Sequence, residues 1–140
     1  MPVSLFWDEE VPAVLRVTFC GRWTWEELRE ISPLIYETCL AEPGRTDVIS
    51  DLSNAPYYPP RYEDGTNQLL ATYRRAPNIV LAVLIQNPLQ HSVFQSYAQR
   101  NPLELPYEFA PTVKAARELI RASRRGQPLP EHVLYTSFGN

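Results

Sequence analysis

Residues 78–88 read Asn-Ile-Val-Leu-Ala-Val-Leu-Ile-Gln-Asn-Pro, and this stretch contains the strongest strand signal of the sequence. Its apolar residues, Ile79 to Ile85, are continuous rather than alternating, which is typical of a central parallel strand covered on both faces. The run is far too short for a membrane span, which needs roughly 20 apolar residues. Asn87-Pro88 then supplies a helix cap followed by a proline at the first helical position. A buried strand that leads directly into a helix predicts an α/β fold.

Strand and helix patterns alternate on both sides of this stretch. Residues 3–8 alternate, and residues 13–20 are rich in β-branched side chains, so the two predict an antiparallel pair at the edge of a sheet. The alternation of strands and helices that follows predicts a mostly parallel sheet. Further strands are expected over 46–52, 78–86 and 106–110, and helices over 24–42, 63–75, 87–101 and 111–125. The predicted order is ββαβαβαβα, a single domain over 1–126 with its helices packed against the sheet.

Two of these helices carry more detailed expectations. Thr24 and Glu27 form a capping box at the start of the first helix. Pro33 lies inside that helix, so we expect a kink there, or a fresh start with Ser32 as the cap. The apolar residues of the third helix are expected to face inward, namely Leu89, Val93, Phe94 and Tyr97.

The tail over 127–140 is too apolar to be expected free in solution. It holds two prolines and then Val133, Leu134, Tyr135 and Phe138. We expect it to pack either on the domain or on a second subunit.

Charge and targeting signals exclude several classes of protein. The 13 basic residues cluster only at Arg121, Arg124 and Arg125, where they suit the end of a helix, so no basic face for nucleic acid is expected. The N-terminus lacks the basic region and apolar stretch of a secretory signal, which predicts a cytoplasmic protein.

The cysteines and histidines predict neither a disulfide nor a metal site. Cys20 and Cys39 form no CxxC or Cys/His pattern, and both are expected to be buried apolar thiols. His91 and His132 stand far apart, so no zinc site is expected. No cofactor is expected either.

The carboxyl ends of the parallel strands are where ligands bind in open α/β sheets. Here that rim holds an unusual loop over 54–62, in which three tyrosines interleave with three prolines. Prolines reduce the entropy lost on binding, and tyrosines suit interfaces, although the same tyrosines could simply cover the core as a lid. The candidate ligand- or partner-binding residues of the rim are Asp51, Asn54, Tyr57, Tyr58, Arg61, Tyr62, Thr66 and Asn87.

Catalytic patterns are missing from the sequence. Asp51, Glu63 and Asp64 could serve acidic catalysis or a magnesium site, but a strand-end aspartate and a solvated acidic helix start explain them better. There is no phosphate-binding glycine loop and no Gly-x-Ser-x-Gly elbow. We therefore expect no enzyme, and an enzyme would require an acid–base pair around Asp51, Asn87 and His91.

Three segments of the sequence occur in an order that is typical of one protein family. They are Val17-Thr18-Phe19-Cys20-Gly21-Arg22-Trp23-Thr24, then Asp47-Val48-Ile49-Ser50-Asp51-Leu52-Ser53, then Tyr107-Glu108-Phe109-Ala110 before an alanine-rich final helix. In these the chain resembles the STAS superfamily, within its SpoIIAA-like set, over residues 3–124. The resemblance implies the fold of the anti-anti-sigma regulators. It also implies a non-enzymatic regulatory or protein-interaction module that works with a protein partner or as a homodimer.

The chain departs from that family at the start of the second helix. Relatives that antagonise anti-sigma factors carry a phosphorylatable serine there, whereas residues 54–66 of this chain form a longer loop without serine. Thr66 is the aliphatic hydroxyl closest to that place. It is either a phosphorylation site or an ordinary threonine near a helix start.

Two functions are consistent with these features. The first is an interaction module that uses the loop over 54–62 and the second helix as its recognition surface. The alternative is a binder of an apolar or lipid-like small molecule at the carboxyl ends of the strands, since the resembling proteins are grouped with lipid-binding folds. That alternative requires an enclosed apolar cavity of about a few hundred Å³. The rings expected to line it are Trp23, Trp25, Tyr57 and Tyr58.

Overall fold

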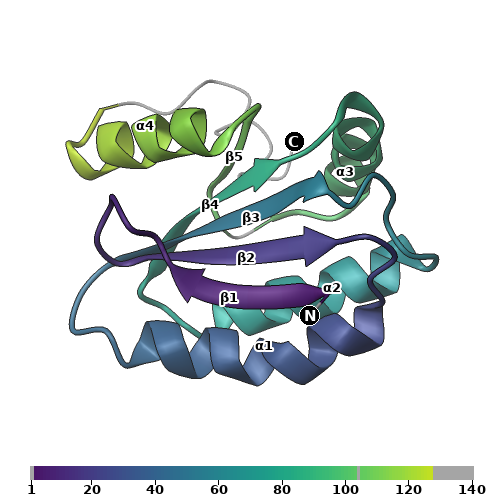
Figure 1. The fold of residues 1–140 in the computed structure, drawn as a ribbon, viewed down its shortest axis with the longest axis horizontal. Helices are drawn as coiled ribbons and strands as arrows, with labels where there is room; N and C mark the ends of the chain where they lie inside the picture. The colour runs from purple at the N-terminus through teal and green to yellow at the C-terminus, as the bar shows by residue number, and fades with distance from the viewer. Residues whose placement is uncertain (1, 104, 128–140) are drawn as a thin grey trace.

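The structure, a computed structural model, describes residues 2–103 and 105–127, in which five strands form one sheet and four helices pack against it (Figure 1). The strands are β1 (Val3–Trp7), β2 (Val14–Cys20), β3 (Thr46–Asn54), β4 (Ile79–Ile85) and β5 (Tyr107–Ala110). The helices are α1 (Trp25–Leu40), α2 (Tyr62–Arg74), α3 (Pro88–Arg100) and α4 (Val113–Arg124). The order ββαβαβαβα confirms the α/β fold expected from the sequence.

The strands lie in the order β1-β2-β3-β4-β5. β1 runs antiparallel to β2, with Leu5 opposite Val17, and every later pair is parallel. Because the parallel strands are added one after another in the same direction, right-handed crossovers place α1, α2 and α3 on one face. α4 follows the last strand and packs on the opposite face against β3, β4 and β5. Figure 1 shows α1 and α2 below the sheet and α4 above it.

Alternation along the strands divides the core into two parts. In β3, the buried Val48 belongs to the cluster under α1, α2 and α3, whereas its neighbour Ile49 belongs to the cluster under α4. β4 supplies side chains to both clusters, which explains why its apolar run is continuous. We call these two sides of the sheet the α1–α3 face and the α4 face.

The expectation of a new helix at Pro33 is wrong. α1 runs from Trp25 to Leu40 with Pro33 inside it, and the hydroxyl of Ser32 donates to the carbonyl of Leu28, 2.8 Å away, instead of capping a new helix. Pro33 lies on the exposed side of α1. There its ring displaces no packed side chain, and water can satisfy the carbonyl that loses its partner.

Two burial expectations are also wrong. Leu89 is 59% exposed, because the cap of α3 turns the neighbouring Gln90 into the core in its place. Cys20 is exposed at the last position of β2, whereas Cys39 is buried as expected.

The predicted packing of the tail over 127–140 concerns residues that, apart from Gln127, lie outside the described part of the chain. Within the described part, none of the helices is both long enough and apolar enough to cross a membrane.

Candidate functional site

A cavity lies on the α1–α3 face, between the carboxyl halves of the parallel strands and α2. It leaves about 50 Å³ for the centre of a water-sized sphere, and the space between its atoms totals about 620 Å³ when the open mouth is included. One water requires about 10–15 Å³ by the first measure, so the cavity has room for several waters or one compact organic molecule. The residues that line it are Phe19, Trp23, Trp25, Ser50, Leu52, Tyr58, Tyr62, Thr66, Leu69, Leu70, Tyr73, Ala82, Leu84, Phe94, Leu103, Leu105 and Tyr107.

The mouth of the cavity is built from aromatic rings. The rings of Trp25 and Tyr58 are nearly parallel, with an interplanar angle of 9° and centroids 6.5 Å apart. Tyr62 meets Tyr58 edge to face at 4.5 Å, and Trp23 meets Trp25 edge to face at 4.9 Å. Trp25, Tyr58 and Tyr62 are half-buried, so these three rings form the wall between the cavity and solvent.

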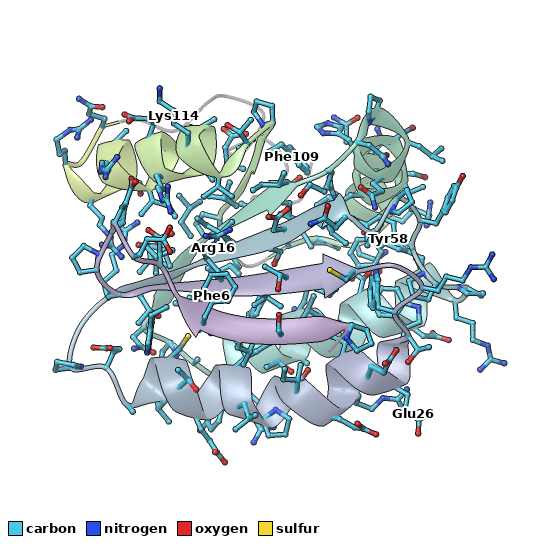
Figure 2. All side chains as sticks on the ribbon, in the orientation of Figure 1. Phe6, Arg16, Glu26, Tyr58, Phe109 and Lys114 are labelled. Atoms are coloured by element: carbon cyan, nitrogen blue, oxygen red, sulfur yellow. The ribbon has the colours of Figure 1, made fainter. Side chains whose placement is uncertain are left out.

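The loop over 55–61 is held over the cavity by hydrogen bonds from other elements. The indole N–H of Trp25 donates to the carbonyl of Pro60 at 2.7 Å, and the amide of Asn87 donates to the carbonyl of Pro56 at 3.0 Å. The side chain of Gln90 donates to the carbonyl of Ala55. The loop is therefore a fixed cover, and Figure 2 shows Tyr58, which belongs to it, at the end of the sheet near α2 and α3.

Gly65 makes room for one of these rings. A Cβ atom at this position would lie 2.1 Å from Cδ2 of Trp25, so the indole rests directly on the backbone of α2. Any larger residue would displace Trp25 from the mouth. The glycine is thus explained by the close contact, which outweighs the roughly 1 kcal/mol of helix stability that glycine costs relative to alanine.

The hydroxyl groups of the cavity are largely paired with one another. Ser50 and Tyr73 share a hydrogen bond of 3.3 Å, and the hydroxyl of Tyr58 accepts from the side chain of Gln86. Burial raises the pKa of Tyr73 to about 12, despite its bond to Ser50. Burial likewise raises the pKa of the Tyr58 and Tyr62 hydroxyls far above the ordinary value. All three rings therefore stay neutral near neutral pH.

Among the predicted site residues, Tyr58, Tyr62 and Thr66 line the cavity. Asn87 lies behind the loop and supports it, whereas Tyr57 points outward and is 72% exposed. Arg61 is exposed and adopts the left-handed conformation, with φ of 62°, at the start of α2.

Asp51 and Asn54 lie away from the cavity. Asp51 accepts a hydrogen bond from the hydroxyl of Ser53 at 2.6 Å, and its Oδ2 lies 3.9 Å from the guanidinium of Arg16. Asn54 is exposed at the end of β3, where its carbonyl accepts from the amide of Gly21. The rim predicted as one site is thus divided, and of its residues only Tyr58, Tyr62 and Thr66 line the cavity.

The residues considered for catalysis, metal binding and phosphorylation lie elsewhere or are buried. His91 and Asn87 share a shallow hollow with Phe109, and Asp51 is not part of that hollow. In residues 2–103 and 105–127, no three His, Cys, Asp or Glu side chains are arranged to hold a metal ion. Thr66 is 5% exposed, so phosphorylation there would require α2 to open.

Gly65, Leu103 and Leu105 are among the residues of the site that sequence reasoning missed. Gly65 could have been found, because an isolated glycine inside a helical pattern indicates a close contact. The two leucines follow α3 in a stretch without periodicity, and nothing local predicts that they fold back over the cavity.

No protein-family model, curated protein or solved structure matches this chain. The resemblance to the STAS superfamily therefore stays a prediction.

Proposed function

We propose that the protein binds a compact, uncharged and mainly apolar small molecule in the cavity between the sheet and α2. The observation that carries this proposal is the composition of the cavity wall. Within the described part of the chain, every residue that lines the cavity is apolar, aromatic or a neutral alcohol. An ionic ligand would lose its hydration there without gaining a partner charge, whereas an apolar ligand would gain from leaving water.

The fixed loop supports this proposal. Trp25, Asn87 and Gln90 hold three successive parts of the loop by their side chains, so the aromatic wall exists before any ligand arrives. A preformed site loses little conformational entropy on binding, which makes even a small contact area sufficient for measurable affinity.

A titration with toluene tests the proposal directly. Trp23 and Trp25 line the cavity, so we expect a saturable change in tryptophan fluorescence and a rise in melting temperature. Replacing Ala82, which lines the cavity from β4, by leucine should abolish both responses by filling the space while the protein remains folded. Ala71→Leu, on the exposed side of α2, is the matched control. A wild-type protein without a saturable response, or an Ala82→Leu variant that responds like the wild type, would contradict the proposal.

A second candidate is the interaction module of STAS type, acting in the cytoplasm on a protein partner or on a second copy of the chain. The observation that favours it is an apolar hollow on the outer side of the loop. Tyr57 and Leu89, at 72% and 59% exposed, border this hollow together with Pro56, Pro59 and Pro60. Large exposed side chains beside rigid prolines are typical of recognition surfaces.

Sedimentation velocity over a range of protein concentrations tests the self-association form of this candidate. We expect the wild type to associate and Tyr57→Ser to weaken the association. Leu34→Ser, which removes another exposed leucine from α1, should leave it unchanged. A wild type that stays monomeric at every concentration would contradict self-association through this surface.

A further inference from the structure

The strand β1 forms one edge of the sheet. Among the described residues it pairs with β2 alone (Figure 1). The amide of Asp8 donates to the carbonyl of Val14 at 2.8 Å, and the amide of Cys20 donates to the carbonyl of Pro2 at 2.7 Å. In an antiparallel pair, every second residue exchanges such bonds with the neighbouring strand. The even-numbered residues of β1 therefore direct their N–H and C=O groups towards β2.

The odd-numbered residues of β1 direct theirs away from the sheet. The outer edge thus carries the backbone groups of Val3, Leu5 and Trp7, a row that can pair with another strand. Proteins usually protect such an edge with a charged side chain, a proline or a bulge. Between Val3 and Trp7, β1 has no charged residue and no proline, and its register against β2 is regular. The edge is therefore open to pairing.

Two large apolar side chains accompany this open edge. Phe6 is 41% exposed and Trp7 is 39% exposed. They point to opposite sides of the sheet, because successive side chains of a strand alternate. The guanidinium of Arg16 lies 4.7 Å from the centre of the Phe6 ring, so this ring is already held in position. A strand added beside β1 would contact an apolar side chain on each side of the sheet.

The edge is complementary to itself. When a second copy approaches antiparallel with Leu5 opposite the partner's Leu5, Val3 lies opposite the partner's Trp7 and Trp7 lies opposite the partner's Val3. Every outward N–H and C=O group of β1 then has a partner. Phe6 comes opposite the partner's Ser4 and diagonal to the partner's Phe6, a separation that aromatic rings can span. A strand that pairs with itself in this way defines a two-fold axis, the symmetry of most dimers.

We infer that two copies of this chain associate through antiparallel pairing of their β1 strands, so that one sheet runs through both. A second copy fits this edge because the same five residues supply complementary hydrogen-bonding groups and apolar side chains from both sides. No charge of β1 is buried by the pairing. The inference goes beyond the proposed function, since the cavity takes no part in the contact.

Sedimentation velocity of the full chain over a range of protein concentrations tests the inference. Leu5→Pro removes the central outward N–H without removing a bond to β2, and Trp7→Lys places a charge on the edge. We expect the wild type to form dimers and each variant to raise the dissociation constant at least roughly 10-fold. Val80→Lys is the matched control, because Val80 is 36% exposed on β4, away from this edge. It should dimerise like the wild type.

Amide hydrogen exchange, followed by NMR on the full chain labelled with ¹⁵N, tests the pairing itself. We expect the Leu5 amide to be protected in the wild-type dimer and to exchange rapidly in Trp7→Lys. The Phe6 amide, which faces β2, should be protected in both. If Leu5→Pro does not fold, Trp7→Lys and the exchange of these two amides decide the question.

Three outcomes would overturn the inference. The first is a wild type that stays monomeric at every concentration. The second is a dimer that both β1 variants leave intact and that Tyr57→Ser dissociates, because the copies would then meet at the loop over 55–61. The third is a monomer whose Leu5 amide is protected, because another segment of the same chain would then occupy the edge.

Discussion

The two faces of the sheet are stabilised by different kinds of interaction. The α4 face combines a small apolar cluster with carboxylates buried against arginines. The α1–α3 face holds the larger cluster, which is built from aliphatic side chains and aromatic rings and contains the cavity. The proposed ligand site lies on the α1–α3 face, where the core cluster of described residues contains no charged side chain.

On the α4 face, two aspartates attach α4 to the rest of the domain. Asp47 is fully buried, and it accepts from Nε of Arg124 at 2.8 Å and from the amide of Leu81 at 3.0 Å. Asp8 is buried against Arg117, whose Nη2 donates to it at 2.8 Å. These bonds are directional, so they fix the position of the helix in addition to its apolar contacts.

On the α1–α3 face, packing is non-directional, and bulky rings that meet edge to face leave space between them. That space suits the proposed uncharged ligand, because none of the described residues that line it is charged. Figure 2 shows this separation, with Arg16 beside Phe6 over β1 and β2 and Tyr58 at the end of the sheet. The guanidinium of Arg16 lies 4.7 Å from the centre of the Phe6 ring. The comparison predicts that alkali weakens one face and acid the other.

The largest expected effect is that of alkali on the cavity. The pKa of Tyr73 is about 12 in the folded protein, against 10 for the free side chain, so its stabilising contribution is complete below pH 10 and is lost as the pH rises towards 12. This difference corresponds to about 3 kcal/mol for Tyr73 alone, and the raised pKa of Tyr58 and of Tyr62 adds to it. Urea unfolding at pH 8 to 11.5 should show stability falling steeply above about pH 10.

Tyr73→Phe serves as the control for the alkaline loss, because it keeps the ring and removes the ionisable group. Its stability should fall less steeply above about pH 10 than that of the wild type. Absorbance at 295 nm reports tyrosine ionisation directly. Ionisation of all eight tyrosines below about pH 11, in a protein that keeps its native circular dichroism, would contradict the prediction.

The second effect is the loss of the buried carboxylate on the α4 face. Asp47→Asn keeps the shape of the side chain but leaves the guanidinium groups of Arg45 and Arg124 without their partner charge. We expect a loss of about 3 kcal/mol in the free energy of unfolding, measured by urea denaturation at pH 7. Glu118→Gln removes an exposed partner of Arg121 and should cost less than about 0.5 kcal/mol. Similar losses in the two variants would show that α4 is not held by its buried charges.

The sequence predicted the sheet well because its signals are local. The continuous apolar run of β4 and the caps at Thr24 and Asn87 each specify an element by themselves. The arginines at the end of α4 were assigned to the helix dipole, whereas Arg124 pairs with Asp47, which is 77 positions away in the chain. Such a pair depends on the tertiary fold, and no periodicity reveals it.

The site was predicted only in part for the same reason. The tyrosines of the loop were recognised by their composition, but which of them face inward depends on the bonds from Trp25, Asn87 and Gln90. Tyr57 points outward, although its neighbour Tyr58 in the same loop lines the cavity. Local sequence can show that a loop is rich in rings without showing which rings form a wall.

A third, smaller effect is expected at Gly65 on the α1–α3 face. In Gly65→Ala the new methyl group would overlap the ring of Trp25, so the ring must leave the mouth of the cavity. The gain in helix propensity offsets part of the cost, and we expect a net loss of about 1–2 kcal/mol in the free energy of unfolding. The tryptophan emission should shift to longer wavelength, and the response to toluene should be lost.

Gly44→Ala is the matched control, because a Cβ atom at Gly44 meets nothing within 4 Å. Its stability and toluene response should equal those of the wild type. A Gly65→Ala variant that keeps the wild-type emission and binds toluene would show that Trp25 is not part of the wall.

The smallest effect is that of acid on the α4 face, and it has the opposite sign to the alkaline effect. Burial raises the pKa of Asp8, but the hydrogen bonds from Arg117 and from the amides of Val11 and Glu10 outweigh burial and hold that pKa below its usual value. A lowered pKa in the folded state means that the contribution to stability is complete above about pH 4 and is lost as the pH falls further. Because burial opposes the hydrogen bonds, this loss should be smaller than the alkaline loss.

Urea unfolding at pH 6 to 2.5 measures the acid effect, and Asp8→Asn should make the fall in stability below about pH 4 less steep. The carboxyl ¹³C resonance of Asp8, followed over the same range, gives the pKa of that group without reference to stability. A value at or above about 3.9 would contradict the prediction. It would mean that the hydrogen bonds from Arg117 only compensate the cost of burying Asp8. In that case α4 would be positioned by its apolar contacts, and the two faces would be stabilised by more similar interactions than their hydrogen bonds suggest.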